Sequence, residues 1–250
     1  LLLYKARLQR RAPGDPTPPE PIGSSGTIPC PWLVATRRVK RTQPPIYDAL
    51  LEHPVFDPTA VQNAGDLNIL IDCLVLRHLL SVRAEQLYSR PPADEDSGFA
   101  DESDLSGSFE VLLQTSDLVS IRFQVYYWSR SAAHPSHSTE VINVQPAAGV
   151  QLWLSDVFQR PEAALAVLRS DCAAQLGLTP DDPFYEGLDP DHANYRCFNI
   201  TRDGLLFTFR EYQVAPYVAG EPSLTIPWQS LVDLLNPSCA VSRFAASQRA

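Results

Sequence analysis

The sequence predicts a two-lobed α+β fold in which antiparallel sheets pack against helices. Apolar and polar residues alternate over 109–127 and again over 198–226, which is typical of half-buried strands joined by tight turns. Residues 61–88 and 162–176 instead repeat apolar side chains every three or four positions, which predicts amphipathic helices. Because strand-rich and helical segments are segregated along the chain, the α+β class is favoured over a regularly alternating α/β class.

An N-terminal α+β lobe with a long helix is predicted over 27–138. Alternation over 27–47 predicts one or two strands, interrupted at Pro44-Pro45. The helix over 61–88 follows, and its predicted core positions are Leu67, Leu70, Ile71, Leu74, His78 and Val82, with Leu76, Leu79 and Leu80 widening the buried face. Residues 89–108 hold six carboxylates among prolines, glycines and serines, and we expect a mobile acidic loop there. The hairpin over 109–127 completes this lobe.

A C-terminal lobe is predicted over 139–240. It begins with two candidate strands, 140–144 and 150–154, and continues with a helix over 162–176 that ends at Gly177. A polar, proline-broken connection over 179–192 separates this helix from the most regular part of the chain.

That regular part, residues 198–235, predicts a three-stranded meander followed by a helix. Asp203-Gly204 is expected to supply the positive φ of a tight hairpin turn, and alternation continues through Tyr212 and Val214. A third strand over 224–226 leads to Pro227, which starts a short leucine-rich helix.

Both ends of the chain differ in composition from the lobes. Residues 1–26 are predicted to be a flexible, basic, proline-rich tether, and 241–250 a tail. The chain contains no methionine, so we expect a processed or truncated product in which Leu1-Leu2-Leu3 is the remnant of a signal or anchor segment. Such a missing segment would place the protein near a membrane.

The charge distribution restricts the partners. The formal net charge is −9, but residues 1–41 carry eight basic and two acidic side chains, leaving 12 basic and 27 acidic side chains in 42–250. A body this acidic repels phosphate backbones, which argues against nucleic-acid binding and favours a cationic partner. The basic N-terminal segment is expected to be a solvated arm, with contact to a membrane surface as the alternative.

Two blocks of the sequence resemble a known domain family. The first comprises Asp203-Gly204-Leu205, an aromatic strand, Tyr212-Gln213-Val214, Pro216-Tyr217, Gly220 and Ile226-Pro227 with the short helix after it. The second comprises Ala133-His134-Pro135, Asn143, Gly149 and the segment Leu152 to Phe158. Both are similar, in order and spacing, to the domain shared by RsiV-type anti-sigma factors and the N-terminal non-catalytic region of PdaC-type peptidoglycan deacetylases. Ser131-Ala132 replaces the usual Gly-Gly, and Gln145 stands where an aspartate is common.

The resemblance implies a periplasmic or extracellular protein, with tethering to a membrane as one form of it. In RsiV-type proteins this domain captures lysozyme, a cationic wall-degrading enzyme, so the resemblance implies a non-enzymatic binding or sensing module of the bacterial cell envelope. A wall component is an equal candidate as ligand. An extracytoplasmic setting would also allow one or two disulfides among Cys30, Cys73, Cys172, Cys197 and Cys239, which the sequence does not assign.

The motif content of the sequence favours binding over catalysis. The sequence has no nucleotide-binding loop, no GxSxG elbow and no HExxH motif. His134 and His137 are its one close histidine pair, which leaves a metal-assisted hydrolase as an alternative, although Pro135 disfavours a helix that would project both rings together. A structural subunit of an envelope complex is a second alternative. We predict no enzymatic activity, no metal and no cofactor.

Aromatic residues supply the predicted partner contacts. Tyrosine and tryptophan are favoured at interfaces, and the candidate contact residues are Tyr212, Tyr217, Trp128 and His134. Trp153 and Trp228 are expected to lie in the core instead.

Overall fold

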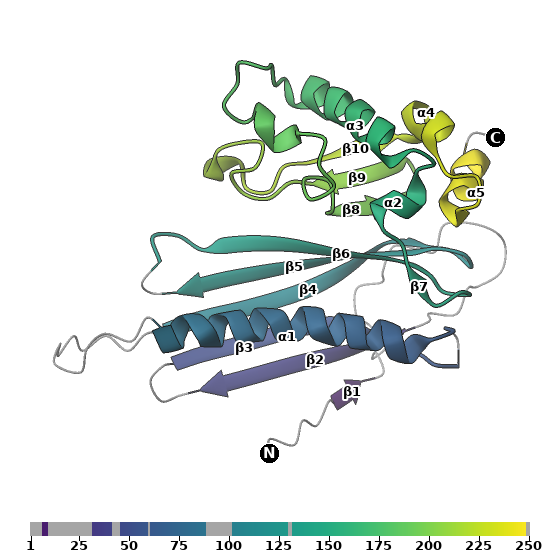
Figure 1. The fold of residues 1–250 in the computed structure, drawn as a ribbon. Coiled ribbons are helices and arrows are strands. Elements are labelled where there is room, and N and C mark those ends of the chain that lie inside the picture. The colour runs from purple at the N-terminus through teal and green to yellow at the C-terminus, as the bar shows by residue number, and fades with distance from the viewer. Residues whose placement is uncertain are drawn as a thin grey trace. The chain divides into compact units, whose positions relative to one another are not determined.

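The computed structural model describes residues 7–9, 32–41, 46–59, 61–88, 102–129 and 132–248. Most of the predicted tether, the break at Pro44-Pro45, Cys30 and the part of the predicted acidic loop up to residue 101 lie outside these described residues. Within them the fold is α+β, with a seven-stranded sheet in the order β1-β2-β3-β4-β5-β6-β7 and a three-stranded sheet in the order β10-β9-β8 (Figure 1).

The chain divides into two compact units. The first contains the described residues up to Phe109 together with Phe123–Ser138, and the second contains Glu110–Arg122 and the chain from Thr139 onward. Glu110–Arg122 therefore belongs to the second unit, whereas the sequence places it in the N-terminal lobe. The segment 109–127, which the sequence predicts to be one hairpin, is thus divided between the two units.

The first unit begins with a meander. Strand β1 (Arg7–Gln9) pairs antiparallel with β2 (Trp32–Arg41), and β2 pairs antiparallel with β3 (Ile46–Phe56) over its whole length, from Trp32 opposite Phe56 to Arg41 opposite Tyr47. Strand β3 extends nine residues past the end of the predicted 27–47 strand region. Arg7–Gln9, which lies inside the predicted tether, is thus part of the sheet.

Helix α1 (Ala64–Tyr88) connects β3 to β4 (Glu102–Gln114), and these two strands pair in parallel. A parallel pair requires a crossover connection, and the helix provides it. The helix lies along the sheet (Figure 1) and buries Leu67, Ile71, Val75 and Val82.

Two of the core positions predicted on α1 were wrong. Leu70 is 42% exposed and Leu80 is 63% exposed. A helix packed on one sheet turns by about 100° per residue, so only one stripe of its surface can face that sheet. The apolar residues outside the stripe remain in contact with solvent.

Residues 102–108, which the sequence predicts to be part of a mobile acidic loop, form the N-terminal half of strand β4 instead. In the structure Ser103 and Leu105 are buried, while Asp104 and Ser106 are exposed. This alternation is that of a strand, and pairing with β3 supplies the backbone hydrogen bonds that the composition does not reveal. The turn to β5 (Val119–Ser129) lies within the hairpin predicted over 109–127, with the Leu118 amide donating to Thr115 Oγ1 at 2.9 Å.

The second unit continues through β6 (Ser136–Gln145) and β7 (Val150–Gln151) into helices. Strand β7 ends three residues before the predicted Leu154, because a short helix α2 (Leu154–Val157) begins there. Helix α3 (Pro161–Leu176) confirms the prediction, with proline in its first turn and Gly177 ending it at a φ of 70°. A 3-10 turn, η1 (Tyr185–Leu188), lies in the polar connection that follows.

The three-stranded sheet confirms the predicted meander: β8 (Phe198–Ile200), β9 (Gly204–Thr208) and β10 (Ser223–Pro227) pair antiparallel. Gly204, however, does not have the positive φ that we expect from Asp203-Gly204. It is required for a different reason, since a Cβ at this position would collide with the Ile226 carbonyl of β10.

The chain after β9 departs from the predicted alternation. The strand ends at Thr208, and Tyr212 adopts a φ of 65°, a left-handed conformation that a strand does not permit. After η2 (Tyr217–Ala219) and β10, helix α4 (Trp228–Leu231) and η3 (Val232–Leu234) follow as predicted from Pro227.

The predicted C-terminal tail is also largely helical. Helix α5 (Ala240–Ser247) buries Ala240, Val241 and Ala245 in the core of the second unit, where Phe207, Leu168 and Trp228 are among the most buried side chains. Two of these three buried residues are alanines, so the sequence gives little indication of their burial. Across the described parts of the chain, no helix combines the length and hydrophobicity that crossing a bilayer would require.

Candidate functional site

The loop between β9 and β10 carries an exposed tyrosine, Tyr212, stacked on a half-buried one, Tyr217. Tyr212 is 57% exposed and stacks on Tyr217, with ring centroids 5.7 Å apart and planes inclined by 29°. Val218, in the same loop, is 91% exposed. We call residues 210–220 the tyrosine loop. It brings together two of the four residues that the sequence predicts as partner contacts.

Gln213 holds the base of the tyrosine loop. Its side-chain Nε2 donates to the Gly187 carbonyl at 3.0 Å and to the Asn194 carbonyl at 3.1 Å, while its Oε1 accepts from the Arg210 amide at 3.2 Å. The backbones approach so closely that a Cβ on Gly187 would overlap the Gln213 carbonyl. Val214, next in sequence, is buried in the core. The loop is therefore anchored through Gln213 and Val214, while the neighbouring Tyr212 is exposed.

The segment that Gln213 contacts is strongly acidic. Residues 181–194 contain no lysine or arginine, and their carboxylates are those of Asp181, Asp182, Glu186, Asp189 and Asp191. Some of these carboxylates also stabilise the segment. Asp182 accepts from the Phe184 amide at 2.9 Å, Asp191 accepts from the Ala193 amide at 2.9 Å, and Asp189 pairs with Arg169 at 2.9 Å. Asp181 and Glu186 are exposed.

The other two predicted contact residues lie in the first unit. Trp128 is half-buried on β5, and His134 is exposed in the loop before β6, with Nδ1 3.0 Å from the Pro135 carbonyl oxygen. His137 packs edge-on against Tyr126 at 5.4 Å between ring centroids. In the described parts of the chain, no group of three or more histidine, cysteine, aspartate or glutamate side chains is arranged to hold a metal ion.

The two tryptophans expected in the core have different environments. Trp228 is 2% exposed and donates its indole N–H to the Arg202 carbonyl at 2.9 Å, which confirms its core position. Trp153 is 61% exposed, so its predicted burial was wrong. Its backbone amide donates to Asp156 Oδ2 at 2.8 Å at the start of α2, and this turn directs the indole outward while Leu152 and Leu154 are buried.

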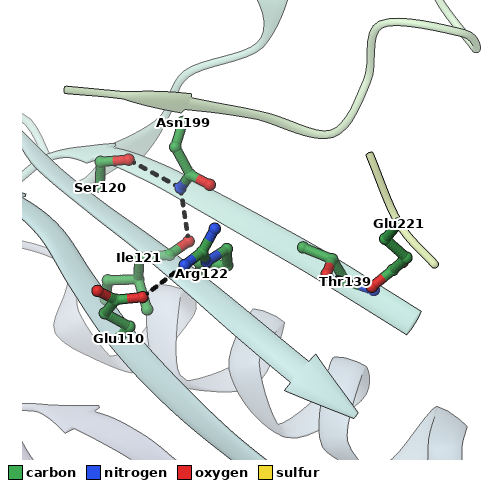
Figure 2. Close-up of polar contacts among 7 residues, drawn as sticks. All are labelled: Glu110, Ser120, Ile121, Arg122, Thr139, Asn199 and Glu221. Carbon is green, nitrogen blue, oxygen red and sulfur yellow. Dashed lines mark hydrogen bonds and ion pairs between the residues drawn. The ribbon is translucent and has the colours of Figure 1, made fainter. Parts of the chain in front are cut away.

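A buried polar cluster occupies the middle of the second unit and includes Asn143, one of the motif residues. Asn143 Oδ1 accepts from Ser120 Oγ at 2.7 Å, and Asn143 Nδ2 donates to the Phe198 carbonyl at 2.8 Å. Asn199 Nδ2 donates to Ser120 Oγ at 2.9 Å and to the Ile121 carbonyl at 3.1 Å (Figure 2). The cluster joins β5, β6 and β8, so we interpret these polar residues as structural.

A second polar contact in Figure 2 fixes the far end of the tyrosine loop. Glu221 accepts two hydrogen bonds from Thr139, at 2.9 Å from the backbone amide and 2.8 Å from the hydroxyl. Both carboxylate oxygens are used, and the bonds tie the chain just before β10 to β6. With Gln213 at its base and Glu221 after its end, the tyrosine loop is held at two points.

The cysteines that the structure describes do not form a reactive centre. Among the cysteines that the structure describes, Cys73, Cys172, Cys197 and Cys239 all carry free thiols. Burial raises the pKa of Cys172 to about 12 and that of Cys197 to about 12, and it also raises the pKa of Cys239. Because the thiolate is the nucleophile, these three buried thiols are poorly suited to nucleophilic chemistry near neutral pH.

Comparisons with known proteins relate the chain to one family. A family model described as "Protein of unknown function (DUF3298)" matches residues 155–229, which include the tyrosine loop. A crystal structure of a DUF3298 family member from Bacteroides fragilis has a TM-score of 0.56 at 17% identity, covering 86% of this chain and 98% of that one. A DUF3298 family protein from Pseudomonas aeruginosa gives 0.57 at 18%, covering 84% and 97%. No curated protein matches the chain. The chain thus carries a DUF3298 segment and shares the fold of both structures.

Proposed function

We propose that this protein is a non-enzymatic binding module of the bacterial cell envelope that captures a cationic protein on its tyrosine loop. Lysozyme is the leading candidate for that partner. The observation that carries the proposal is the stacking of exposed Tyr212 on half-buried Tyr217 in an anchored loop.

The aromatic stack has the properties of an interface anchor. Tyrosines offer a large contact area with few rotatable bonds, and such residues dominate binding energy at protein interfaces. Gln213 and Glu221 hold the loop before any partner arrives, which lowers the entropy lost on binding. Tyr212 also holds a left-handed backbone, a conformation that is unfavourable for a non-glycine residue and is often found at functional sites.

Charge supports the choice of a cationic partner. The tyrosine loop is bonded to a segment with five carboxylates and no lysine or arginine, in a body with 27 acidic and 12 basic side chains over 42–250. Such an acidic surface accelerates encounters with a positively charged protein. Tyrosine faces also attract lysine and arginine side chains.

The cell-envelope setting rests on the resemblance of residues 131–236 to the extracytoplasmic domain of RsiV-type proteins. The non-enzymatic assignment rests on the lack of a recognisable catalytic motif in the sequence. The polar residues of the second unit support it, because Ser120, Asn143 and Asn199 are buried and bonded to one another rather than exposed to a substrate.

The test is binding of the full chain to immobilised lysozyme, measured at about 50 mM and about 500 mM salt, where the screening length shortens severalfold. We expect a micromolar or tighter complex that weakens with salt. The Tyr212→Asn/Tyr217→Ala variant should bind about 10-fold or more weakly, because it removes both aromatic anchors while asparagine tolerates the left-handed backbone. Trp153→Ala, which removes an exposed aromatic from another part of the same unit, is the matched control.

Two results would contradict the proposal. If no salt-sensitive complex forms at micromolar concentrations, lysozyme is not the partner. If a complex forms but Trp153→Ala weakens it as much as the double tyrosine variant does, the tyrosine loop is not the contact site. An Asp181→Asn/Glu186→Gln variant tests the charge argument, and it should reduce the salt dependence while leaving the tyrosines in place.

A further inference from the structure

Helix α1 carries an apolar stripe on the side opposite the one that packs on the sheet. Ile69 is 60% exposed, Leu80 is 63% exposed, Cys73 is exposed and Leu76 is half-buried. The spacing of these residues is four, three and four, which places them within an arc of about 60° at 100° per residue. This is the seam by which helices pair in coiled coils.

The opposite side of the helix already has its partner. Leu67, Ile71, Val75 and Val82 are buried at 5% exposure or less, and on a helical projection they are centred about 180° from the exposed stripe. A helix with apolar residues on two opposite sides is stable when both are covered. Within the described residues, the sheet covers only one.

The exposed side is nearly symmetrical about the midpoint between Leu74 and Val75. Reversing the helix about that point exchanges Asp66 with Arg83, Ile69 with Leu80, Leu70 with Leu79, and Cys73 with Leu76. Every apolar position is thus matched with an apolar position, and the acidic residue at one end with a basic residue at the other. Asp66 and Arg83 are both exposed.

We propose that α1 packs antiparallel against α1 of a second copy of this chain, forming a reversible twofold dimer. In this arrangement each Ile69 packs near the partner's Leu80, and each Asp66 lies beside the partner's Arg83. Each of these two contacts occurs twice by symmetry, as an isologous interface requires. A parallel arrangement would instead place Asp66 beside Asp66 and Arg83 beside Arg83, so the charges select the antiparallel one.

The size of the surface predicts a weak dimer. Asp66 to Arg83 spans 18 residues, or about 27 Å of helix. One helix pair of that length buries less than the roughly 1,600 Å² of a standard stable interface. We therefore expect dissociation in the micromolar range rather than a permanent dimer. The inference is independent of the tyrosine loop, which belongs to the other unit.

A charge swap tests the pairing and its direction. Sedimentation velocity of the full chain, over about 1 to 500 μM, should show a concentration-dependent dimer, consistent with a small interface. Asp66→Arg alone and Arg83→Asp alone each place like charges together twice, and each should raise the dissociation constant about 10-fold. The double variant Asp66→Arg/Arg83→Asp restores opposite charges and should restore the dimer. Ile69→Glu should abolish it, and circular dichroism of each variant checks the fold.

Cross-linking gives an independent measurement. The Cys73 positions of the two copies lie about 10 Å apart in the proposed register, given an interhelical distance of 8–10 Å. A bismaleimide of about that length should join two chains, and Cys73→Ser should eliminate the product. A monomer at all concentrations would overturn the proposal. So would a dimer that the single charge variants leave intact, or one that the double variant fails to restore.

Discussion

Gln213 Nε2 donates a 3.0 Å hydrogen bond to the Gly187 carbonyl and so joins the tyrosine loop to the acidic segment 26 residues earlier. The same loop carries the stack of Tyr212 on Tyr217. Glutamine is a suitable anchor because its side-chain amide both donates and accepts hydrogen bonds, and here it donates two and accepts one. Four further predictions follow from such local relationships.

Replacing Gln213 should loosen the tyrosine loop. Gln213→Ala removes two donated bonds and one accepted bond, which at about 1 kcal/mol each predicts a destabilisation of about 2–3 kcal/mol. Urea unfolding of the full chain measures it. Gln175→Ala is the matched control, because Gln175 is exposed and makes one long bond of 3.3 Å to the Thr225 carbonyl. Equal effects of the two substitutions would show that Gln213 is not an anchor.

Two glycines should respond to alanine in opposite directions. At Gly204 a Cβ would collide with the backbone of β10, so Gly204→Ala should destabilise the protein by about 2 kcal/mol or more. Gly65, in the first turn of α1, has nothing within 4 Å of its Cβ position, so Gly65→Ala should be neutral or stabilising by up to about 1 kcal/mol. The melting temperatures of the two variants, compared with that of the parent chain, test both expectations. An undiminished melting temperature for Gly204→Ala would contradict the close approach of β9 and β10.

Ser120 and Asn143 should be energetically coupled. Either substitution to alanine removes the 2.7 Å bond between them and leaves its buried partner without that bond, which predicts about 1–3 kcal/mol for each single variant. The double variant should cost less than the sum, by about 1 kcal/mol or more. Denaturant unfolding of the four proteins gives the coupling energy. Strict additivity would show that the cluster does not act as a unit.

Alkaline pH should weaken the fold through Cys172. Burial raises its pKa to about 12 in the folded protein, while an exposed thiol ionises near about 8.5. Between about pH 8.5 and pH 12 the unfolded chain therefore binds fewer protons than the folded protein does. Stability is complete below about pH 8 and falls as the pH rises towards 12.

Urea midpoints measured from pH 7 to pH 10.5 should decline more steeply for the parent chain than for Cys172→Ala. Below pH 8 the thiol keeps its proton in both states, so the two slopes should coincide there. Parallel slopes across the whole range would show that Cys172 makes no contribution to the pH dependence.

Local patterns in the sequence were enough to determine several elements. The α+β class, the β4–β5 turn, helix α3 with its glycine end, and the order of β8, β9 and β10 all agree with the predictions. These features depend on the alternation of side chains, on proline and on glycine, whose effects act within a few residues. Likewise, Trp228 after Pro227 marks both a helix start and a buried ring.

Other features depend on neighbours that are distant in the sequence. The acidic residues 102–108 become a strand because β3 pairs with them, and Tyr212 leaves the strand because its loop is anchored to Gly187 and Asn194 through Gln213. Trp153 is turned outward at the start of α2, although a large aromatic side chain is expected in the core.

The sequence by itself determined the α+β class, helix α3, the meander of β8, β9 and β10, and the acidic character of the body. Only the tertiary structure decided which apolar side chains are covered, because burial depends on the surface that each element meets. Helix α1 shows the difference: its leucines and isoleucines predict a wide buried face, but a single sheet covers one stripe and leaves Ile69 and Leu80 exposed on the other. In the same way, Tyr212 and Tyr217 are two aromatic residues in the sequence and a stacked pair only in the folded loop.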